Sequence, residues 1–280
     1  VKAPDGLFNV VHGFGHEIGD ALVRHPHVKA VSFTGGTATG KTIATVAAPL
    51  LKKTSFELGG KNPSIVFADC NLEQSIASVA RAAFFNSGQV CLCGSRVLVA
   101  AEIYDDFVDA LVEQALLYRD RIGPMVSAEH REKVMSYIEL AKQEGGEIVC
   151  GGQAYGDPNG AFFEPTVITG LSHDCRTVQE EIFGPVVTVH PFDDDEHALE
   201  LANDTEFGLA SSVFTSNLQR AHHFAEHIQS GMVWVNDWNL RDLRVPFGGM
   251  KQSGVGREGG DYSFKFFSQD RNVCVRYNYE

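Results

Sequence analysis

Along the first 60 residues, short strand-like runs of apolar positions alternate with segments in which the apolar positions have helical spacing. Short β-rich runs at 7–11 ("LFNVV") and 30–36 ("AVSFTGG") are each stopped by glycine, which is typical of strands. The segment between them, "HEIGDALVRHP", has helical spacing and closes at Pro26. Helical spacing returns in "TATGKTIATVAAPLLKK", and "KTSFELGG" returns to a strand. This β-α-β-α-β order predicts a doubly wound parallel sheet.

The same alternation continues to the end of the chain and predicts an α/β fold throughout. A helix that begins at Asn71 has a capping side chain and an acidic first turn with Glu73. The glycine-rich stretch 151–160 is expected to be a surface loop, and 272–279 ("NVCVRYNY") alternates like an exposed strand that needs a partner. Further strands are predicted at 63–70, 95–100, 185–192, 211–216 and 231–236, and further helices at 71–90, 103–118, 127–146, 194–203 and 217–230.

Composition and charge exclude several classes of protein. With 44% hydrophobic and 21% charged residues among 280, the chain is too apolar to be mainly disordered. A formal net charge of -13 argues against a nucleic-acid partner bound through its phosphates. No apolar run approaches the roughly 18 residues of a membrane helix. The chain begins with Val1, inside what reads as the end of a loop.

The cysteines indicate reduced thiols in the cytoplasm. Only Cys91 and Cys93 are close, at C-x-C spacing, with no second pair to complete a zinc site, so no metal is expected. No signal peptide is visible at the start, which makes a secreted disulfide framework improbable. The other cysteines are Cys70, Cys150, Cys175 and Cys274.

Two glycine patterns invite a phosphate-binding interpretation. Gly13, Gly15 and Gly19 form G-x-G-x-x-x-G, one residue longer than the dinucleotide fingerprint. A loop followed by a helix start is therefore the favoured interpretation there. Gly35 and Gly36 lie between a predicted strand and a helix, where free amides and the helix dipole favour an anion. A plain tight turn is an equally good interpretation of that motif alone.

Candidate chemistry gathers in three segments, "FELGGKNP", "FFNSGQVCLCGSR" and "EEIFGP". Cys91 follows a Gly-Gln turn, where a deprotonated thiol could act as a nucleophile, although a buried structural thiol is the ordinary alternative. Glu57 ends a strand and could be a general base if burial raises its pKa; the alternative is a solvated charge. No histidine forms an obvious pair with a cysteine, which disfavours a cysteine hydrolase.

Taken together, the motifs resemble the aldehyde dehydrogenase superfamily. They are "VSFTGGTATG", "ELGGKNP", "FFNSGQVCLCGSR", "EPTVI", "EEIFGPV", "NDTEFGLASSVFT", "GMVWVN" and "PFGGMKQSGVGREGG". They stand in the order of the family and cover nearly the whole chain. The resemblance implies an aldehyde dehydrogenase-like fold, with part of a Rossmann-type cofactor domain, an α/β catalytic domain and a C-terminal oligomerisation strand.

The resemblance implies that Cys91, and not Cys93, is the nucleophile. Cys91 would attack the aldehyde to form a thiohemiacetal, which loses hydride to leave a thioester, and its backbone N–H would be one oxyanion donor. Glu57 would activate the water that hydrolyses the thioester. NAD is the expected cofactor, and NADP is not excluded. The implied cofactor-binding residues are Leu58 and Gly59 beside the nicotinamide, Glu181 and Phe183 at its ribose and ring, and Gly35 and Gly36 at the pyrophosphate.

A finer resemblance concerns the substrate. The segment "NDWNLRDLRVPFGG" is similar to the 2-hydroxymuconic and 2-aminomuconic semialdehyde dehydrogenases, in which it lines the substrate tunnel. Phe247 is then expected in the tunnel wall, and Arg241 is a candidate clamp for a substrate carboxylate. Arg241 could instead pair with Asp242, and Arg244 competes for the same role. Trp238 could face the tunnel or belong to the core. Another specificity, such as the betaine-aldehyde type, is the alternative.

The resemblance begins in the middle of the family's cofactor domain. We therefore expect a truncated chain with part of the NAD-binding domain at 1–59, a catalytic domain at 60–252 and a C-terminal segment at 253–280. The family's first Rossmann strands and oligomerisation hairpin would lie in a missing half, so little activity is expected of these residues alone. The parent enzyme would be a homodimer or homotetramer. A turn at 116–127 is shorter than in the family, and only local consequences are expected from it because it is remote from Cys91 in sequence.

Overall fold

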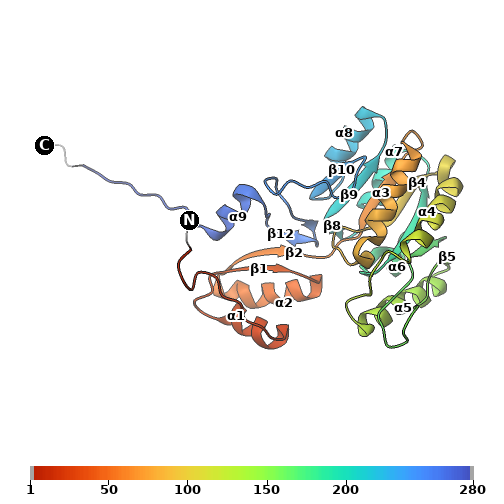
Figure 1. Cartoon of the computed structure of the whole chain (residues 1–280). Helices are drawn as coiled ribbons and strands as arrows, with labels where there is room; N and C mark the ends of the chain where they lie inside the picture. Colours follow the sequence, from red (N-terminus) through yellow and green to blue (C-terminus); the bar gives the residue numbers. More distant parts are fainter. Residues whose placement is uncertain (1–2, 278–280) are drawn as a thin grey trace.

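Residues 3–277 are described by a computed structural model, in which two β-sheets carry most of the strands (Figure 1). The smaller sheet has the order β1-β2-β12. Strands β1 (Ala30–Thr34) and β2 (Lys53–Glu57) run parallel and are joined by helix α2 (Thr37–Ala47). Strand β12 (Gly254–Val255) pairs antiparallel with β2. The smaller sheet therefore combines two strands from the N-terminal part of the chain, β1 and β2, with one strand from its C-terminal part, β12.

The larger sheet has seven strands in the order β10-β9-β3-β4-β7-β6-β5. All its neighbouring strands are parallel except β5, which runs antiparallel to β6. These strands are β3 (Asn62–Val66), β4 (Gly94–Ala100), β5 (Glu147–Cys150), β6 (Thr166–Thr169), β7 (Val186–Phe192), β9 (Ala210–Phe214) and β10 (Met232–Val235), and the short strands β8 (Phe207–Gly208) and β11 (Met250–Lys251) pair with each other elsewhere.

Helices cover both faces of the larger sheet, because its strands are apolar on both sides. Val97 and Val99 of β4 pack in the cluster with α3 and α4, whereas Leu98 and Ala100 pack in the cluster with α7 and α8. This is the period of two expected of a strand. Figure 1 shows these two pairs of helices on opposite faces. The helices are α1 (Asp20–Arg24), α3 (Leu72–Phe84), α4 (Tyr104–Tyr118), α5 (Ala128–Gln143), α6 (Arg176–Gln179), α7 (Asp195–Asn203), α8 (Leu218–His227) and α9 (Gly260–Phe267).

Local sequence signals explain where the longer helices begin. The Asn71 side chain accepts a hydrogen bond from the Gln74 amide at 3.2 Å and caps α3, as predicted. The Ser127 side chain caps α5 by accepting from the His130 amide at 3.1 Å. Each of these bonds satisfies an amide that has no partner inside its helix.

Three predictions about elements need correction. The predicted strand at 7–11 is wrong, because no other strand among the described residues pairs with it and its apolar side chains stay exposed. The helix predicted over 71–90 ends at Phe84, after which the backbone turns left-handed. Residues 272–277 form no paired strand, since no other segment in the described part of the chain bonds to them, and 278–279 lie outside the described residues.

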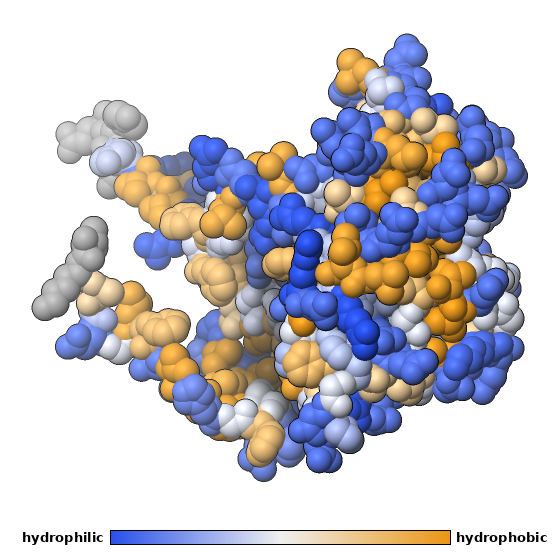
Figure 2. Space-filling view, turned by 45° about the vertical axis from the view of Figure 1, so that its right-hand side comes forward, coloured by the Kyte–Doolittle hydropathy of each residue, from blue (hydrophilic) through white to orange (hydrophobic). Residues whose placement is uncertain are grey.

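Large apolar side chains are exposed near both ends of the described chain. Phe8 is 86% exposed and Phe264 of α9 is 75% exposed. Figure 2 shows the resulting orange areas on the side of the molecule where the chain ends lie. A group of large exposed apolar side chains is typical of a surface that contacts another polypeptide segment. Within residues 3–277, none of the helices has the length and apolarity that a membrane crossing requires.

Candidate active site

Glu57 is buried at the last position of β2. Its side chain and backbone together are only 3% exposed, and neither carboxylate oxygen has a hydrogen-bond partner among the described residues. Burial raises the pKa of Glu57 to about 8, and the neighbouring Glu258 adds to the rise, while Arg257 and Arg241 oppose it. The interpretation of Glu57 as a solvated strand-end charge is therefore wrong. A carboxyl group with this pKa can exchange a proton near neutral pH.

Cys91 lies in a loop between α3 and β4. The buried Asn62 holds this loop, because its Nδ2 donates to the carbonyl of Cys91 at 2.8 Å and to that of Cys93 at 2.9 Å. Burial raises the pKa of Cys91 to about 11, with further upward contributions from Glu181 and Glu57. The thiol is therefore protonated at neutral pH in this state.

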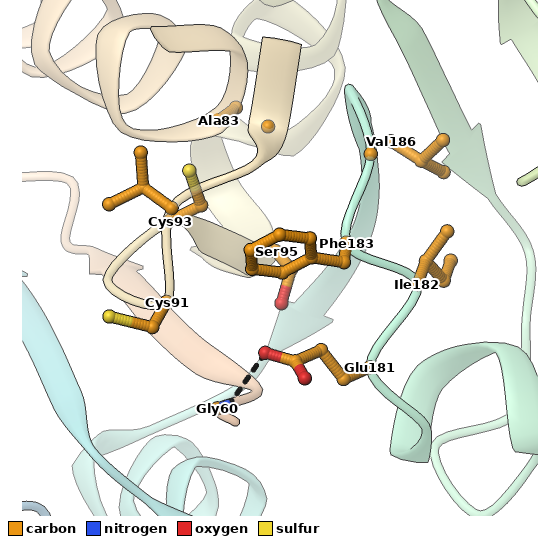
Figure 3. Close-up of a pocket in the computed structure, with 12 residues that line it drawn as sticks. Gly60, Ala83, Cys91, Cys93, Ser95, Glu181, Ile182, Phe183 and Val186 are labelled. Atoms are coloured by element: carbon orange, nitrogen blue, oxygen red, sulfur yellow. Dashed lines mark hydrogen bonds between the residues drawn. The ribbon is translucent and has the colours of Figure 1, made fainter. Parts of the chain in front are cut away.

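The two cysteines of the C-x-C pair have different surroundings. Cys93 is buried, and burial raises its pKa to about 12. Cys91 is only half-buried, and both cysteines line a pocket of about 20 Å³ together with Glu181 and Phe183. That volume is about what one water molecule requires. Figure 3 shows the Cys91 sulfur directed away from Glu181. This exposure fits the choice of Cys91 over Cys93 as the accessible thiol.

The opposite wall of this pocket comes from the segment that follows α6. Glu181 Oε1 accepts a hydrogen bond from the Gly60 amide at 3.0 Å (Figure 3). A Cβ at Gly59 would lie 2.3 Å from Glu181 Oε2, so a side chain there would displace the Glu181 carboxylate. Phe183 has a left-handed backbone, with φ of 61°, and its carbonyl accepts from His130 Nε2 at 2.7 Å. The turn after β2 and the Glu181–Phe183 segment therefore fit closely together.

Gly88 joins the cysteine loop to the same segment, and its replacement by alanine should destabilise the fold. Its φ is +68°, and an added Cβ would lie 2.0 Å from the carbonyl oxygen of Gly184. We expect Gly88→Ala to lower the free energy of unfolding by about 2 to 4 kcal/mol, from backbone strain and overpacking. Urea denaturation measures this change. Gly123→Ala is the control, because a Cβ there meets nothing within 4 Å; equal losses in both variants would contradict the assignment.

Arg241 and Phe247 are together, as the tunnel prediction requires. The Arg241 guanidinium carbon lies 4.4 Å from the centre of the Phe247 ring, and both residues line a cavity of about 420 Å³. Asp242 pairs with Arg244, whose Nε donates to Asp242 Oδ1 at 2.9 Å. Arg241 forms no ion pair within residues 3–277. Of the two arginines, Arg244 is in an ion pair, whereas Arg241 is in none within residues 3–277.

Trp238 is packed in the core of the chain, one of the two places predicted for it. It is 2% exposed and packs with Leu92 and Trp234. Its ring Nε1 donates to the Leu92 carbonyl at 2.8 Å. Trp238 therefore supports the cysteine loop from behind and contributes no wall to the cavity that Arg241 lines.

A groove of about 840 Å³ lies beside α1, β1 and α2. Gly15 and Gly19, from the glycine pattern that resembled an over-long fingerprint, line it, and they also form the helix start that was favoured there. Gly36 is the N-cap residue of α2 and provides no side-chain cap. The Gly35 amide donates to the Glu57 carbonyl at 3.0 Å, which brings this turn next to the buried carboxyl group. Leu58 is buried, and its side chain packs close to Gly40 of α2.

Several residues of this site carried no prediction. Asn62 and Lys61 stand in the quoted "ELGGKNP" motif, and their polarity inside an apolar strand start was the available signal. Lys61 Nζ donates to the carbonyls of Thr177 and Glu180, both at 2.9 Å, just before Glu181. His130 gave no signal, since its contact with Phe183 joins residues far apart in sequence.

The chain is similar to aldehyde dehydrogenases both in sequence and in structure. The sequence model of the aldehyde dehydrogenase family matches residues 1–273. A 2-aminomuconic 6-semialdehyde dehydrogenase from Pseudomonas sp is 49% identical over 293 positions, which cover 100% of this chain and 60% of that protein. A 2-hydroxymuconic semialdehyde dehydrogenase from Pseudomonas putida is 47% identical over 286 positions, covering 98% and 59%. The chain thus spans about three fifths of the length of these relatives.

Among solved structures, a betaine aldehyde dehydrogenase from Staphylococcus aureus in complex with NAD+ superimposes with a TM-score of 0.88. It is 42% identical, and the match covers 90% of this chain and 52% of that one. The α/β fold predicted from the motifs is confirmed by this likeness.

Proposed function

The chain belongs to the aldehyde dehydrogenase family, and from that premise we propose that the whole protein oxidises an aldehyde to the carboxylic acid through a thioester on Cys91. The observations that carry the proposal are an accessible thiol at Cys91 and a buried carboxyl group at Glu57, whose charge acts on that thiol and whose pKa burial raises to about 8. Aldehyde-dependent reduction of NAD by the whole protein, with release of the acid, tests it. Failure of NAD to be reduced by any aldehyde tried would overturn it.

In the proposed reaction, the Cys91 thiol gives its proton to the ionised Glu57, which releases it to solvent, and the sulfur attacks the aldehyde carbon to form a thiohemiacetal. The developing oxyanion accepts a hydrogen bond from the Cys91 backbone N–H. Once the thiohemiacetal has lost hydride, the product is a thioester. Glu57 then takes a proton from a water molecule, which adds to the thioester carbon and expels the Cys91 thiolate. The carboxylic acid leaves, and the thiol regains its proton.

The groove beside α1 and α2 fits a dinucleotide. Its volume of about 840 Å³ lies within the usual range of ligand sites. Added Cβ atoms at Gly15 and Gly19, which line it, would meet nothing within 4 Å, so these positions leave the space open. When bound, NAD would supply the hydride acceptor. We assign Gly35 and Gly36 to its pyrophosphate, Leu58 and Gly59 to the region of its nicotinamide, and Glu181 and Phe183 to the ribose and ring; NADP is the alternative cofactor.

We further propose that the substrate is a muconic semialdehyde. Relatives with such names are 43 to 49% identical. The semialdehyde carries a carboxylate, and Arg241 offers a guanidinium without an ion-pair partner in the described part of the chain, above Phe247. The solved betaine aldehyde dehydrogenase raises the alternative of a betaine-type aldehyde. An unpaired arginine would repel that cationic substrate, which favours the carboxylated one.

Arg241→Ala should therefore raise the KM of the whole protein for a carboxylated semialdehyde by about 10- to 100-fold, the value of one charge-assisted hydrogen-bonded pair. The KM for an uncharged aliphatic aldehyde should change little. Steady-state kinetics with both substrates measures the difference. Arg244→Ala is the matched control, because Arg244 is exposed and already pairs with Asp242. Equal effects of Arg241→Ala on both aldehydes would remove the clamp.

We also propose a division of the protein into domains and an oligomeric state. We assign residues 1–59 to a cofactor domain, 60–252 to a catalytic domain and 253–280 to a C-terminal segment that carries an oligomerisation strand. The pairing of β12 with β2 supports a structural link between the first and last of these. The exposed apolar residues near the chain ends support a homodimeric or homotetrameric enzyme, which we place in the cytoplasm.

A further inference from the structure

The loop that leads to Cys91 has an unusual backbone. Asn86, Ser87 and Gly88 are three consecutive residues with positive φ, at 51°, 56° and 68°. Side chains other than glycine rarely adopt this left-handed conformation, and seldom in succession. The turn is therefore unfavourable by itself, so contacts from the rest of the fold must hold it.

Two of those contacts come from the turn that follows α4, which we call the brace segment (residues 119–126). Ser87 is buried, and its Oγ donates a hydrogen bond to the carbonyl of Gly123 at 2.6 Å. Two residues later, Gln89 Oε1 accepts from the backbone amide of Val126 at 2.8 Å. The two bonds connect the cysteine loop to the brace segment at both ends of its Ser87–Gln89 stretch.

The brace segment is itself held in place from its other side. The Met125 amide donates to the Ala161 carbonyl at 2.8 Å, and the Arg119 carbonyl accepts from the Tyr155 hydroxyl at 2.8 Å. Arg119 also forms an ion pair with Glu164 at 3.2 Å. The short turn is thus a folded part of the molecule. The expectation of only local consequences rested on distance in sequence from Cys91, whereas the two hydrogen bonds show that the turn contacts the cysteine loop in space.

We propose that the brace segment positions the nucleophile, and that Ser87 and Gln89 are the positioning residues through which it acts. The importance of this for catalysis rests on the proposed function, but the mechanical link does not. With the left-handed turn held, Cys91 stays half-buried at the pocket beside Glu181 and Phe183. Without the two bonds, the turn would relax toward right-handed backbone and expose the thiol to water.

Alkylation of Cys91 by iodoacetamide tests this proposal on the chain as it stands, with no need for substrate or cofactor. Peptide mass spectrometry follows each cysteine separately across a range of pH. In Ser87→Ala and Gln89→Leu, we expect the rate at Cys91 at pH 8 to rise about tenfold, because each unit by which exposure lowers the thiol pKa adds a factor of ten in thiolate. The midpoint of the pH profile should move down from about 11.

Three controls separate a local brace from general loosening. Cys70 and Cys150, which are half-buried elsewhere, should keep their rates, and the exposed Cys274 calibrates the reagent. Ser268→Ala removes a similar hydroxyl-to-carbonyl bond far along the chain and should change nothing at Cys91. Gln89→Glu keeps the acceptor oxygen, so it should restore the slow rate; its added negative charge can only raise the thiol pKa further.

Unchanged Cys91 rates in both Ser87→Ala and Gln89→Leu would overturn the brace. So would a parallel rise at Cys70 and Cys150, or a Gln89→Glu variant as fast as Gln89→Leu. The alkylation result does not depend on the dehydrogenase reaction. If alkylation supports the brace but the whole protein oxidises no aldehyde, the proposed function is refuted and the brace is not. In an active whole protein, Ser87→Ala should lower kcat while the KM for NAD stays within about twofold.

Discussion

Cys91→Ala should abolish aldehyde oxidation by the whole protein, with a loss on the order of 10⁴-fold or more. Cys93 lines the same pocket but is buried, and burial raises its pKa to about 12, so it is the less accessible of the two thiols. Steady-state NAD reduction measures the loss. Intact-protein mass spectrometry should at the same time detect an acylated wild-type protein and no acylated Cys91→Ala variant.

Cys93→Ala is the matched control for that experiment, because it removes the second thiol of the same loop. It should keep most of the activity, with a modest loss from the small cavity left behind. Equal losses in Cys91→Ala and Cys93→Ala would mean that the nucleophile is misassigned.

Glu57→Gln should leave the protein able to acylate, because the thiol proton can pass directly to solvent, but slow to release product, with kcat lower by about 10²- to 10⁴-fold. The pKa of Glu57 is about 8, so wild-type turnover limited by hydrolysis should rise with pH to a midpoint near 8. Gln has no titratable group, and the variant should lose this limb of the profile. Rapid-quench experiments should find accumulated thioester. A variant with wild-type kcat and an unchanged profile would exclude Glu57 as the base.

The same carboxyl group should make stability depend on pH, with a definite sign. Its folded pKa lies above its ordinary value of 4.5, so the fold favours the neutral form. The contribution of this carboxyl group to the free energy of unfolding is complete below pH 4.5. It is lost as the pH rises through 8, at about 1.4 kcal/mol per pH unit. Glu57→Gln should flatten that decline. Urea denaturation at pH 6 and at pH 9 checks this, and an equal decline in both proteins would contradict it.

Much of the fold was predictable because its signals are local. Asn71 and the Ser127–His130 pair mark helix starts within four residues, and alternating burial along β4 follows from the strand period. The strand at 7–11 was mispredicted because a strand needs a partner, which a local pattern cannot guarantee. The helix over 71–90 was predicted too long, since its last residues are held left-handed by contacts from other segments.

The candidate site divides in the same way. Its candidate residues Cys91, Glu57 and Glu181 could be selected from the sequence, because the motifs around them resemble those of a known family over nearly the whole chain. Their electrostatics were not predictable, since the pKa of Glu57 depends on burial and on Glu258, 201 positions away in the chain. The groove beside α1 and α2 was also missed, because it exists only where the two helices flank β1.

The sequence by itself determined the α/β class and most of the order of elements, and it singled out Cys91 and Glu57 as candidate reactive side chains, because these signals lie in residues close together along the chain. Tertiary structure alone decided which arginine is free, since the answer depends on where the Asp242 carboxylate lies in space. It also decided that the short turn after α4 touches the cysteine loop, because hydrogen bonds act over about 3 Å whatever the separation in sequence.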